Sequence, residues 1–163
     1  RHKIRIRKYV DSNICYLEVK KKNNVGVTNK FRCSIDNFET KLSPSSIKFI
    51  KKNTNYSHIL NPVLSNTFNR FTLVNKKQPE RVTIDSQILF KTDNSTKSLD
   101  KIVVIEVKHE KGKDNTAIYK ALKMKKIPIV SFSKYCVGIS NLIPSIKSNQ
   151  FKEINLNINK ICK

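Results

Sequence analysis

Residues 3–22, KIRIRKYVDSNICYLEVKKK, alternate between apolar and charged side chains. Ile4 and Ile6 share one parity, and Arg5 and Arg7 share the other. A polar break follows, after which the alternation resumes. Successive side chains of a β-strand point to opposite faces, so this period predicts two strands that pair as an antiparallel hairpin. One face of the hairpin is charged. The sequence therefore raises the question whether this face is only solvated or lines a site.

Further segments rich in Val, Ile, Thr and Phe predict more strands, for a total of about seven that mostly follow one another as a meander. The segment KIVVIEVKH is the most apolar of them. The additional strands are predicted at residues 30–35, 66–74, 81–90, 101–109 and 127–132.

Helices are few. The segment TKLSPSSIKFIKKN places Pro44 near a helix start, and DNTAIYKALKMKK carries an apolar stripe at helical spacing with Asp114, Asn115 or Thr116 as N-cap. The predicted fold class is therefore mainly β with a few helices (α+β). At 163 residues the chain is expected to form a single domain, residues 1–163, with a sparse C-terminal tail at 145–163.

The charge balance points to an anionic partner. Lys and Arg number 33 against 12 Asp and Glu, which gives a net charge of +21, while hydrophobic residues make up 38% of the chain. A charge of this size opposes a compact state unless anions neutralise it. Nucleic acid, nucleotide, polyphosphate and an anionic membrane surface are the candidate partners.

Several other kinds of site are disfavoured. The four cysteines are far apart and lack a C-x-x-C pair, which favours free thiols in a reducing, cytoplasmic location. The three histidines lack zinc-site spacing, and no P-loop or Rossmann glycine pattern is present. No apolar run approaches membrane-spanning length, so membrane association is expected only through a partner protein.

Charged residues recur two apart on several predicted strands, which places each pair on one face. Glu106 lies in the middle of the apolar strand IVVIEVK, where a carboxylate needs a cation or a metal as partner. Asp85 shares the parity of Arg81 and could pair with a cation or assist a metal. The pairs are Arg5 with Arg7, Glu18 with Lys20, Lys30 with Arg32, and Glu106 with Lys108.

An antiparallel β-barrel would reconcile these patterns, because one face of every strand would line a basic tunnel. Arg and Lys bind phosphate oxygens, and Arg often does so through two hydrogen bonds. Mg²⁺ or Mn²⁺ prefers oxygen ligands and bridges phosphates, so Glu106 and Glu18 are the candidate metal ligands. Glu18 could instead pair with Lys20.

Seven short motifs in order resemble the VTC-type polyphosphate polymerase domains of the triphosphate tunnel metalloenzyme superfamily, which also contains the CYTH-type enzymes. The resemblance covers about residues 3–139. The motifs are KIRIRKY, YLEVKKK, NKFR, FNRF, RVTID, VIEVK and FSKYC.

The resemblance implies roles for individual residues. The basic pair of the family looks like Arg5 and Arg7, and its metal-holding glutamate looks like Glu106. The remaining family positions look like Lys20, Lys30, Arg70, Ser133 and Lys134. Arg32, Arg81 and Lys108 fall on the charged faces of their predicted strands, so they are expected to be further phosphate ligands.

The sequence departs from the family pattern in three places. Phe68 stands where the family has Tyr, and Ser131 where eukaryotic members tend to have Lys. The family's first strand has no counterpart, so the tunnel is expected to be incomplete or open at its N-terminal end. Tyr16 replaces the first Glu of the CYTH pattern E-x-E-x-K, which disfavours a CYTH phosphatase or cyclase.

The predicted activity is metal-dependent transfer of the ATP γ-phosphoryl group to a growing polyphosphate chain, with ATP as substrate and Mn²⁺ or Mg²⁺ as cofactor. One alternative is a tunnel-fold tripolyphosphatase, which hydrolyses instead. Another is a non-catalytic basic domain that binds nucleic acid or polyphosphate. The nucleic-acid alternative is the weaker one, because the basic faces hold few aromatic residues for base stacking.

Overall fold

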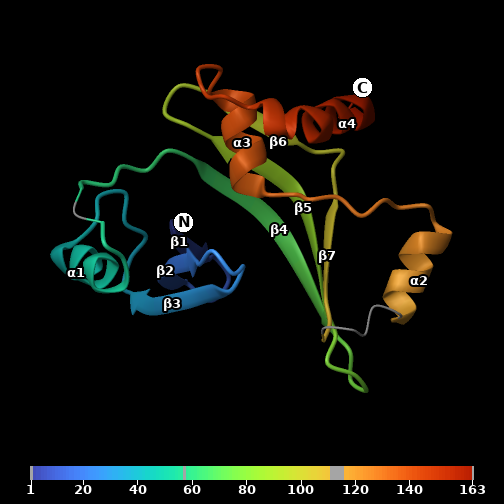
Figure 1. The fold of residues 1–163 in the computed structure, drawn as a ribbon, viewed down its shortest axis with the longest axis horizontal. Helices are drawn as coiled ribbons and strands as arrows, with labels where there is room; N and C mark the ends of the chain where they lie inside the picture. Colours follow the sequence, from blue (N-terminus) through green and yellow to red (C-terminus); the bar gives the residue numbers. More distant parts are fainter. Residues whose placement is uncertain (1, 57, 111–115, 163) are drawn as a thin grey trace. The chain divides into compact units, whose positions relative to one another are not determined.

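The computed structural model describes residues 2–56, 58–110 and 116–162. The chain separates into two compact units, residues 1–62 and residues 63–163. Both units are built on antiparallel sheets with a few helices (Figure 1), so the predicted fold class is confirmed at this level. The two units are described one at a time below.

The first unit is a three-stranded antiparallel meander followed by one helix. The predicted hairpin is confirmed: its strands meet at a turn where Asn13 adopts a positive φ of 50°, which Asn tolerates better than most residues. The elements are β1 (His2–Tyr9), β2 (Ile14–Lys22), β3 (Thr28–Ile35) and α1 (Pro44–Asn53).

The apolar side chains of this sheet lie on the face that packs against α1, and they form the core of the first unit. Leu17 and Val19 of β2 are completely buried against Ile50 of α1. As predicted, α1 begins at Pro44, and the side chain of Ser43 caps it by accepting from the amide of Ser46. Since one face of the sheet is covered by α1, the charged parity occupies the opposite face.

The second unit is built around the long strand β5 (Arg81–Lys91). β4 (Ser65–Val74) pairs along one edge of β5. The other edge is shared end to end by β6 (Thr96–Leu99) and β7 (Val104–Lys108). All these pairings are antiparallel, and β4 joins β5 by a hairpin at residues 75–80.

A β-bulge in this sheet places charged and apolar residues on the same face. Phe68 of β4 lies opposite two residues of β5, and Gln87 in the bulge has a φ of 51°. The extra residue shifts the parity of β5 by one position. As a result Asp85 and the buried core residue Ile88 face the same side, although they are an odd number of residues apart.

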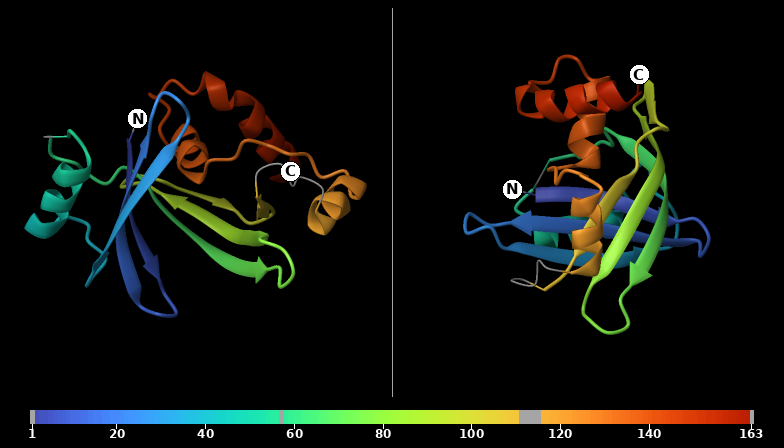
Figure 2. Two further views of the ribbon diagram at one scale, coloured as in Figure 1. Left: turned by 60° about the horizontal axis from the view of Figure 1, so that its bottom comes forward. Right: turned by 90° about the vertical axis from the view of Figure 1, so that its right-hand side faces the viewer.

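Three α-helices follow the sheet: α2 (Ala117–Met124), α3 (Lys134–Leu142) and α4 (Lys152–Cys162), with a single 3₁₀ turn, η1 (Asn149–Phe151), before the last. Figures 1 and 2 show α3 and α4 at the end of β4 and β5 that is remote from their hairpin. The core beneath them contains Ile88, Phe90, Leu99, Ile102, Val137 and Ile158.

Gly138 permits the close approach of α3 to the sheet. A Cβ atom at this position would lie 2.6 Å from Cδ2 of Leu64 and 2.8 Å from Cδ1 of Phe90. These distances are too short for a Cβ atom, so any other residue here would force Leu64 and Phe90 to shift. Glycine therefore allows the close packing, despite its cost in the interior of a helix.

Several predictions about single elements are wrong. Residues 127–132 do not form a strand, because Pro128 lacks an N–H group and the amide of Ile127 instead ends α2 by donating to the carbonyl of Leu122. β6, α3 and α4 were not predicted. The supposed tail instead packs its α4 residue Ile158 into the core. Of the proposed caps for α2, Thr116 is confirmed, whereas residues 114 and 115 lie outside the described residues.

The predicted barrel is not found as a closed structure. Within residues 2–56, 58–110 and 116–162, the strands form one three-stranded and one four-stranded sheet, and no strand of the first pairs with a strand of the second. A tunnel lined by both sheets therefore remains a prediction from the family resemblance.

Candidate functional site

The charged face of the first unit is a grid set by strand register. Arg5 of β1, Glu18 of β2 and Arg32 of β3 stand directly opposite one another across the sheet. Lys20 and Lys30 form a neighbouring row on the same face. Directly opposite residues share a face and lie about 4.5–5.5 Å apart at Cβ, so the grid brings charged side chains together.

Glu18 is the centre of this grid. Its carboxylate is fully buried and contacts three cations. Oε2 accepts from Nε and lies 2.5 Å from Nη2 of Arg5, while Oε1 lies 2.7 Å from Nζ of Lys30 and 3.0 Å from Nη2 of Arg32. The three cationic side chains remain 28%, 37% and 39% exposed, respectively. One negative charge thus orients three positive charges that still reach solvent.

The ionisation of Glu18 follows from these contacts. Burial alone would raise the pKa of Glu18, but the hydrogen bonds and positive charges of Lys30 and Arg5 lower it to about 2. The carboxylate is therefore ionised at every physiological pH. Burial and the charge of Arg7 lower the pKa of Arg5, although Glu18 opposes this shift.

Two aromatic rings complete the first face. The guanidinium of Arg32 lies 4.5 Å from the ring centroid of Tyr16, and Nη1 of Arg7 donates to the hydroxyl of Tyr9 at 3.1 Å. Both contacts restrict the rotamers of the arginine side chains. The two tyrosines thus help to position the arginines of this face.

The second unit carries a similar arrangement around Asp85 of β5. Asp85 is buried and accepts two hydrogen bonds from Arg70 of β4, Nε to Oδ1 at 2.5 Å and Nη2 to Oδ2 at 2.6 Å. The Nζ group of Lys134, the first residue of α3, also contacts Oδ2. Burial alone would raise the pKa of Asp85, but the hydrogen bonds from Arg70 and Lys134 lower it.

Phe68 holds the two cations of this cluster on its ring face. The Nζ atom of Lys134 lies 4.5 Å from the ring centroid, and the Cζ atom of Arg70 lies 5.1 Å from it. Phe68, which stands where the related family has Tyr, thus makes cation–π contacts with both cations of the cluster.

The same face of the second sheet continues towards the β4–β5 hairpin. The strand register places Thr83 opposite Glu106, and Arg81 opposite Lys108. Glu106 is half exposed and forms an ion pair of 3.1 Å with Lys108. Cations thus lie at both ends of a face that has Glu106 between them.

All the residues predicted from the sequence lie in these two arrangements or beside them. Ser133 is one step removed, since its side chain caps α3 by accepting from the amide of Cys136. The first unit contributes Arg5, Arg7, Glu18, Lys20, Lys30 and Arg32, and the second contributes Arg70, Arg81, Glu106, Lys108 and Lys134.

The sequence did not reveal the central role of Glu18 and Asp85. Glu18 was expected to pair with Lys20 or to help a metal, and the structure shows ion pairs of Glu18 with Arg5, Lys30 and Arg32. For Asp85, the alternative of pairing with a cation is the one observed. The sequence did show an acidic residue on the same strand face as several basic residues. Which of these cations it contacts depends on how neighbouring strands pair, and the sequence alone does not give this pairing.

The two glutamates differ in their fit to a divalent metal. Both oxygens of Glu18 already accept from cations, and three positive charges surround it, so its surroundings repel a metal ion. Glu106 is half exposed and bound to one lysine, which leaves acceptor capacity. Mg²⁺ is commonly held by one or two carboxylates together with substrate phosphates. The described residues contain no group of three or more His, Cys, Asp or Glu that could hold a metal.

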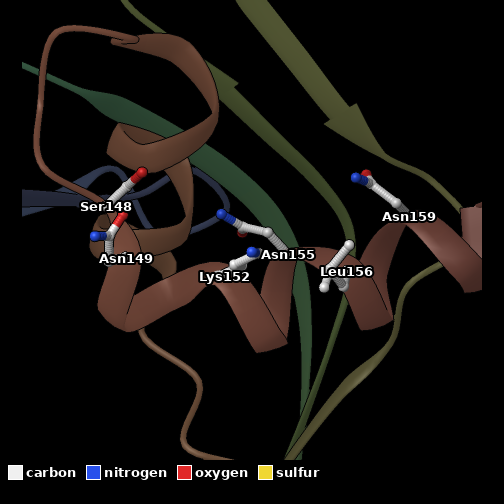
Figure 3. A pocket seen from close by; sticks show the side chains of 6 residues that line it. All are labelled: Ser148, Asn149, Lys152, Asn155, Leu156 and Asn159. Carbon is white, nitrogen blue, oxygen red and sulfur yellow. The ribbon is translucent and has the colours of Figure 1, made fainter.

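A separate pocket of about 350 Å³ lies along η1 and α4 (Figure 3). Asn155 within it is bound to Asn141 and Ser140 of α3, so it serves helix packing. Most of its lining is uncharged, unlike the two charged faces. The lining residues are Ser148, Asn149, Lys152, Asn155, Leu156 and Asn159.

The VTC domain family matches residues 1–143, which is most of the sequence. The chain belongs to the VTC domain family. No match was found among curated protein sequences or among solved structures. Among the helices that the structure describes, none has the length and apolar character needed to cross a membrane.

We predict that Glu18→Gln lowers the free energy of unfolding by about 1–3 kcal/mol at pH 7, because three cations lose a charged acceptor. Urea unfolding of both proteins between pH 7 and pH 2 measures this difference. Ionised Glu18 makes its full contribution to stability at pH values above about 4.3, the pKa of a glutamate in the unfolded chain. This contribution is lost as pH falls towards the folded value of about 2, so the two proteins should converge there.

Glu153→Gln is the matched control, because Glu153 lies exposed in the first turn of α4. It should change stability little at any pH. A Glu18→Gln difference that stays constant down to pH 2 would show that packing, not charge, accounts for the loss.

Proposed function

We propose that this VTC domain catalyses metal-dependent transfer of the ATP γ-phosphoryl group to a growing polyphosphate chain. One observation carries the proposal: each unit has a buried carboxylate, Glu18 or Asp85, that holds more positive charges than it neutralises. The surplus is partly exposed and lies on one sheet face in each unit. Such fixed cations suit a ligand with many phosphate groups.

The anchored cations would bind phosphate at low entropic cost. Arg5, Lys30 and Arg32 are already held in one geometry by Glu18, and Arg70 and Lys134 by Asp85. Side chains fixed before binding lose less rotamer freedom when the ligand arrives. We therefore propose that the charged face of each unit binds phosphate groups.

The chemical step needs little from the protein besides position and charge. A terminal phosphate oxygen of the acceptor chain would attack the γ-phosphorus of ATP, the bond to the bridging β,γ-oxygen would break, and ADP would leave. Arg5, Arg7, Lys20 and Lys30 would neutralise phosphate oxygens from the first unit, and Arg70 and Lys134 from the second. A bound Mg²⁺ or Mn²⁺ would supply further charge neutralisation on the phosphate oxygens, with Glu106 as its protein ligand.

Hydrolysis of tripolyphosphate would use the same residues with water as the acceptor, so it is an alternative outcome of the activity assays. The nucleic-acid alternative is less favoured. Tyr16 and Phe68 lie on the charged faces, but each is covered by a cation at 4.5 Å from its ring centroid. Rings occupied in this way do not present a free platform for stacked bases.

The proposal is tested by binding of inorganic tripolyphosphate, measured by calorimetry at fixed salt. Arg5→Ala together with Arg70→Ala should weaken binding by at least about a hundredfold, since each removes a charge-assisted contact. Lys51→Ala with Lys125→Ala removes the same charge from exposed positions in α1 and at the end of α2. This control should retain most of the affinity.

Random duplex DNA distinguishes the alternative function in the same assay. It should bind weakly, and no more weakly to the Arg5/Arg70 variant than to the lysine control. If DNA binding falls with Arg5 and Arg70 while tripolyphosphate does not bind at all, the proposed enzyme is wrong and a nucleic-acid-binding domain takes its place.

The metal assignment has its own test. Glu106→Gln preserves the size of the side chain but removes the negative charge that a hard cation needs. We expect loss of Mg²⁺- or Mn²⁺-dependent ATP turnover, whereas tripolyphosphate without metal should bind no more weakly than it binds the unaltered protein. Glu153→Gln again serves as the control. Full metal-dependent turnover in the Glu106→Gln protein would show that Glu106 is not the ligand.

A further inference from the structure

The β4–β5 hairpin of the second unit borders a pocket of about 380 Å³ that the phosphate-binding roles do not explain. It lies where the charged face ends, beyond Arg81 and Lys108 and away from α3 and α4. Its volume falls within the usual range for small-ligand sites, about 300–1,000 Å³. The lining residues are Val74, Asn75, Gln78, Pro79, Glu80, Arg81, Lys108, His109 and Glu110.

Glu80 is fixed in this pocket by the hairpin itself. The backbone amide of Asn75 donates to the carbonyl of Glu80 at 2.9 Å, and Nδ2 of Asn75 donates to Oε2 of Glu80 at 3.2 Å. Oδ1 of Asn75 in turn accepts from the amides of Lys77 and Gln78. Asn75 thus closes the loop and holds one oxygen of the Glu80 carboxylate.

Among the described residues, the second oxygen of this carboxylate has no hydrogen-bond partner. Glu80 is only 7% exposed, and its Oε1 atom is buried without a donor among the residues that the structure describes. Leaving a buried polar atom without a partner is unfavourable, so such atoms are usually satisfied by a ligand or by water. The missing partner must be a donor, because an ionised carboxylate only accepts.

The pocket combines two opposite preferences. Arg81 and Lys108 attract phosphate, whereas the carboxylates of Glu80 and Glu110 repel it. A bare phosphate chain would therefore be repelled by the carboxylates at this end of the face. A ligand that carries hydroxyl donors at one end and phosphates at the other satisfies both groups of residues.

We infer that this pocket binds the nucleoside end of a nucleoside triphosphate, with Oε1 of Glu80 accepting a hydrogen bond from a ribose hydroxyl. Carboxylates bind the ribose hydroxyl in this manner in dinucleotide-binding folds. Val74 and Pro79 supply apolar surface for the base, and Arg81 and Lys108 bind the first phosphates. The inference rests on the proposed function, since it assigns the nucleotide end of the same substrate.

The rest of the face accommodates the phosphates. From Arg81 the strand runs four residues to Asp85, roughly 14 Å at 3.4 Å per residue. Thr83 lies between them on the same face, opposite Glu106 of β7. The terminal phosphate would then approach Arg70 and Lys134, which places the transferred group furthest from the hairpin.

The test compares ATP, 2′,3′-dideoxy-ATP and inorganic tripolyphosphate as ligands of the whole chain by calorimetry without metal. ATP should bind the unaltered protein about tenfold more tightly than dideoxy-ATP, the effect of one hydrogen bond to a charged group. In Glu80→Gln the preference for ATP over dideoxy-ATP should shrink, because a neutral amide oxygen accepts a weaker hydrogen bond than a carboxylate does. Tripolyphosphate should bind this variant no more weakly than before.

The charge change makes this result specific. Removing a negative charge near Arg81 and Lys108 favours every polyanion, so electrostatics alone would strengthen ATP binding to Glu80→Gln. Glu153→Gln controls for the substitution type at an exposed site of the same unit. The comparison of ATP with dideoxy-ATP on the unaltered protein needs no variant, so it decides the question even if Glu80→Gln does not fold.

The outcomes separate the two proposals. Equal binding of ATP and dideoxy-ATP to the unaltered protein, with tripolyphosphate still bound, would overturn the ribose site and leave the proposed function intact. Absence of binding by all three ligands would overturn the proposed function itself.

Discussion

The functional surfaces of this chain depend on a buried carboxylate that holds several cations. In isolation, the guanidinium and ammonium groups of a strand face repel one another and sample many rotamers. Glu18 and Asp85 remove both problems, because each accepts from two or three cations and fixes them on one sheet face. The positive charge that remains is oriented and partly exposed. It can therefore bind phosphate with little reorganisation, which is the condition for electrostatic catalysis.

The alternation in the sequence predicts much of the fold, because it reports a property of single strands. It identified the hairpin of β1 and β2 and most of β3, β4, β5 and β7. It failed where structure depends on distant partners. The apolar segment at residues 127–132 has no neighbouring strand to pair with among the described residues, and Pro128 removes a donor. In α4 the spacing of Ile154, Ile158 and Cys162 was a helical signal, but the intervening asparagines weakened it.

The candidate site was predictable in part for the same reason. Parity placed Arg5, Lys30 and Arg32 on one face, and the structure confirms this arrangement within the first unit. Parity does not say which residues stand opposite one another, so the central place of Glu18 became visible only from the register. The bulge at Gln87 is a second example, since it changes the parity of β5 and brings Asp85 onto the face that α3 covers.

The central claim is that a buried carboxylate in each unit fixes cations that bind phosphate. Nitrogen NMR of the arginine side chains tests it directly, because Nε of Arg5 donates to Glu18 and Nε of Arg70 donates to Asp85, each at 2.5 Å. On titration with inorganic tripolyphosphate, both Nε–H signals should shift and then saturate. A titration that leaves either signal unmoved would contradict the claim.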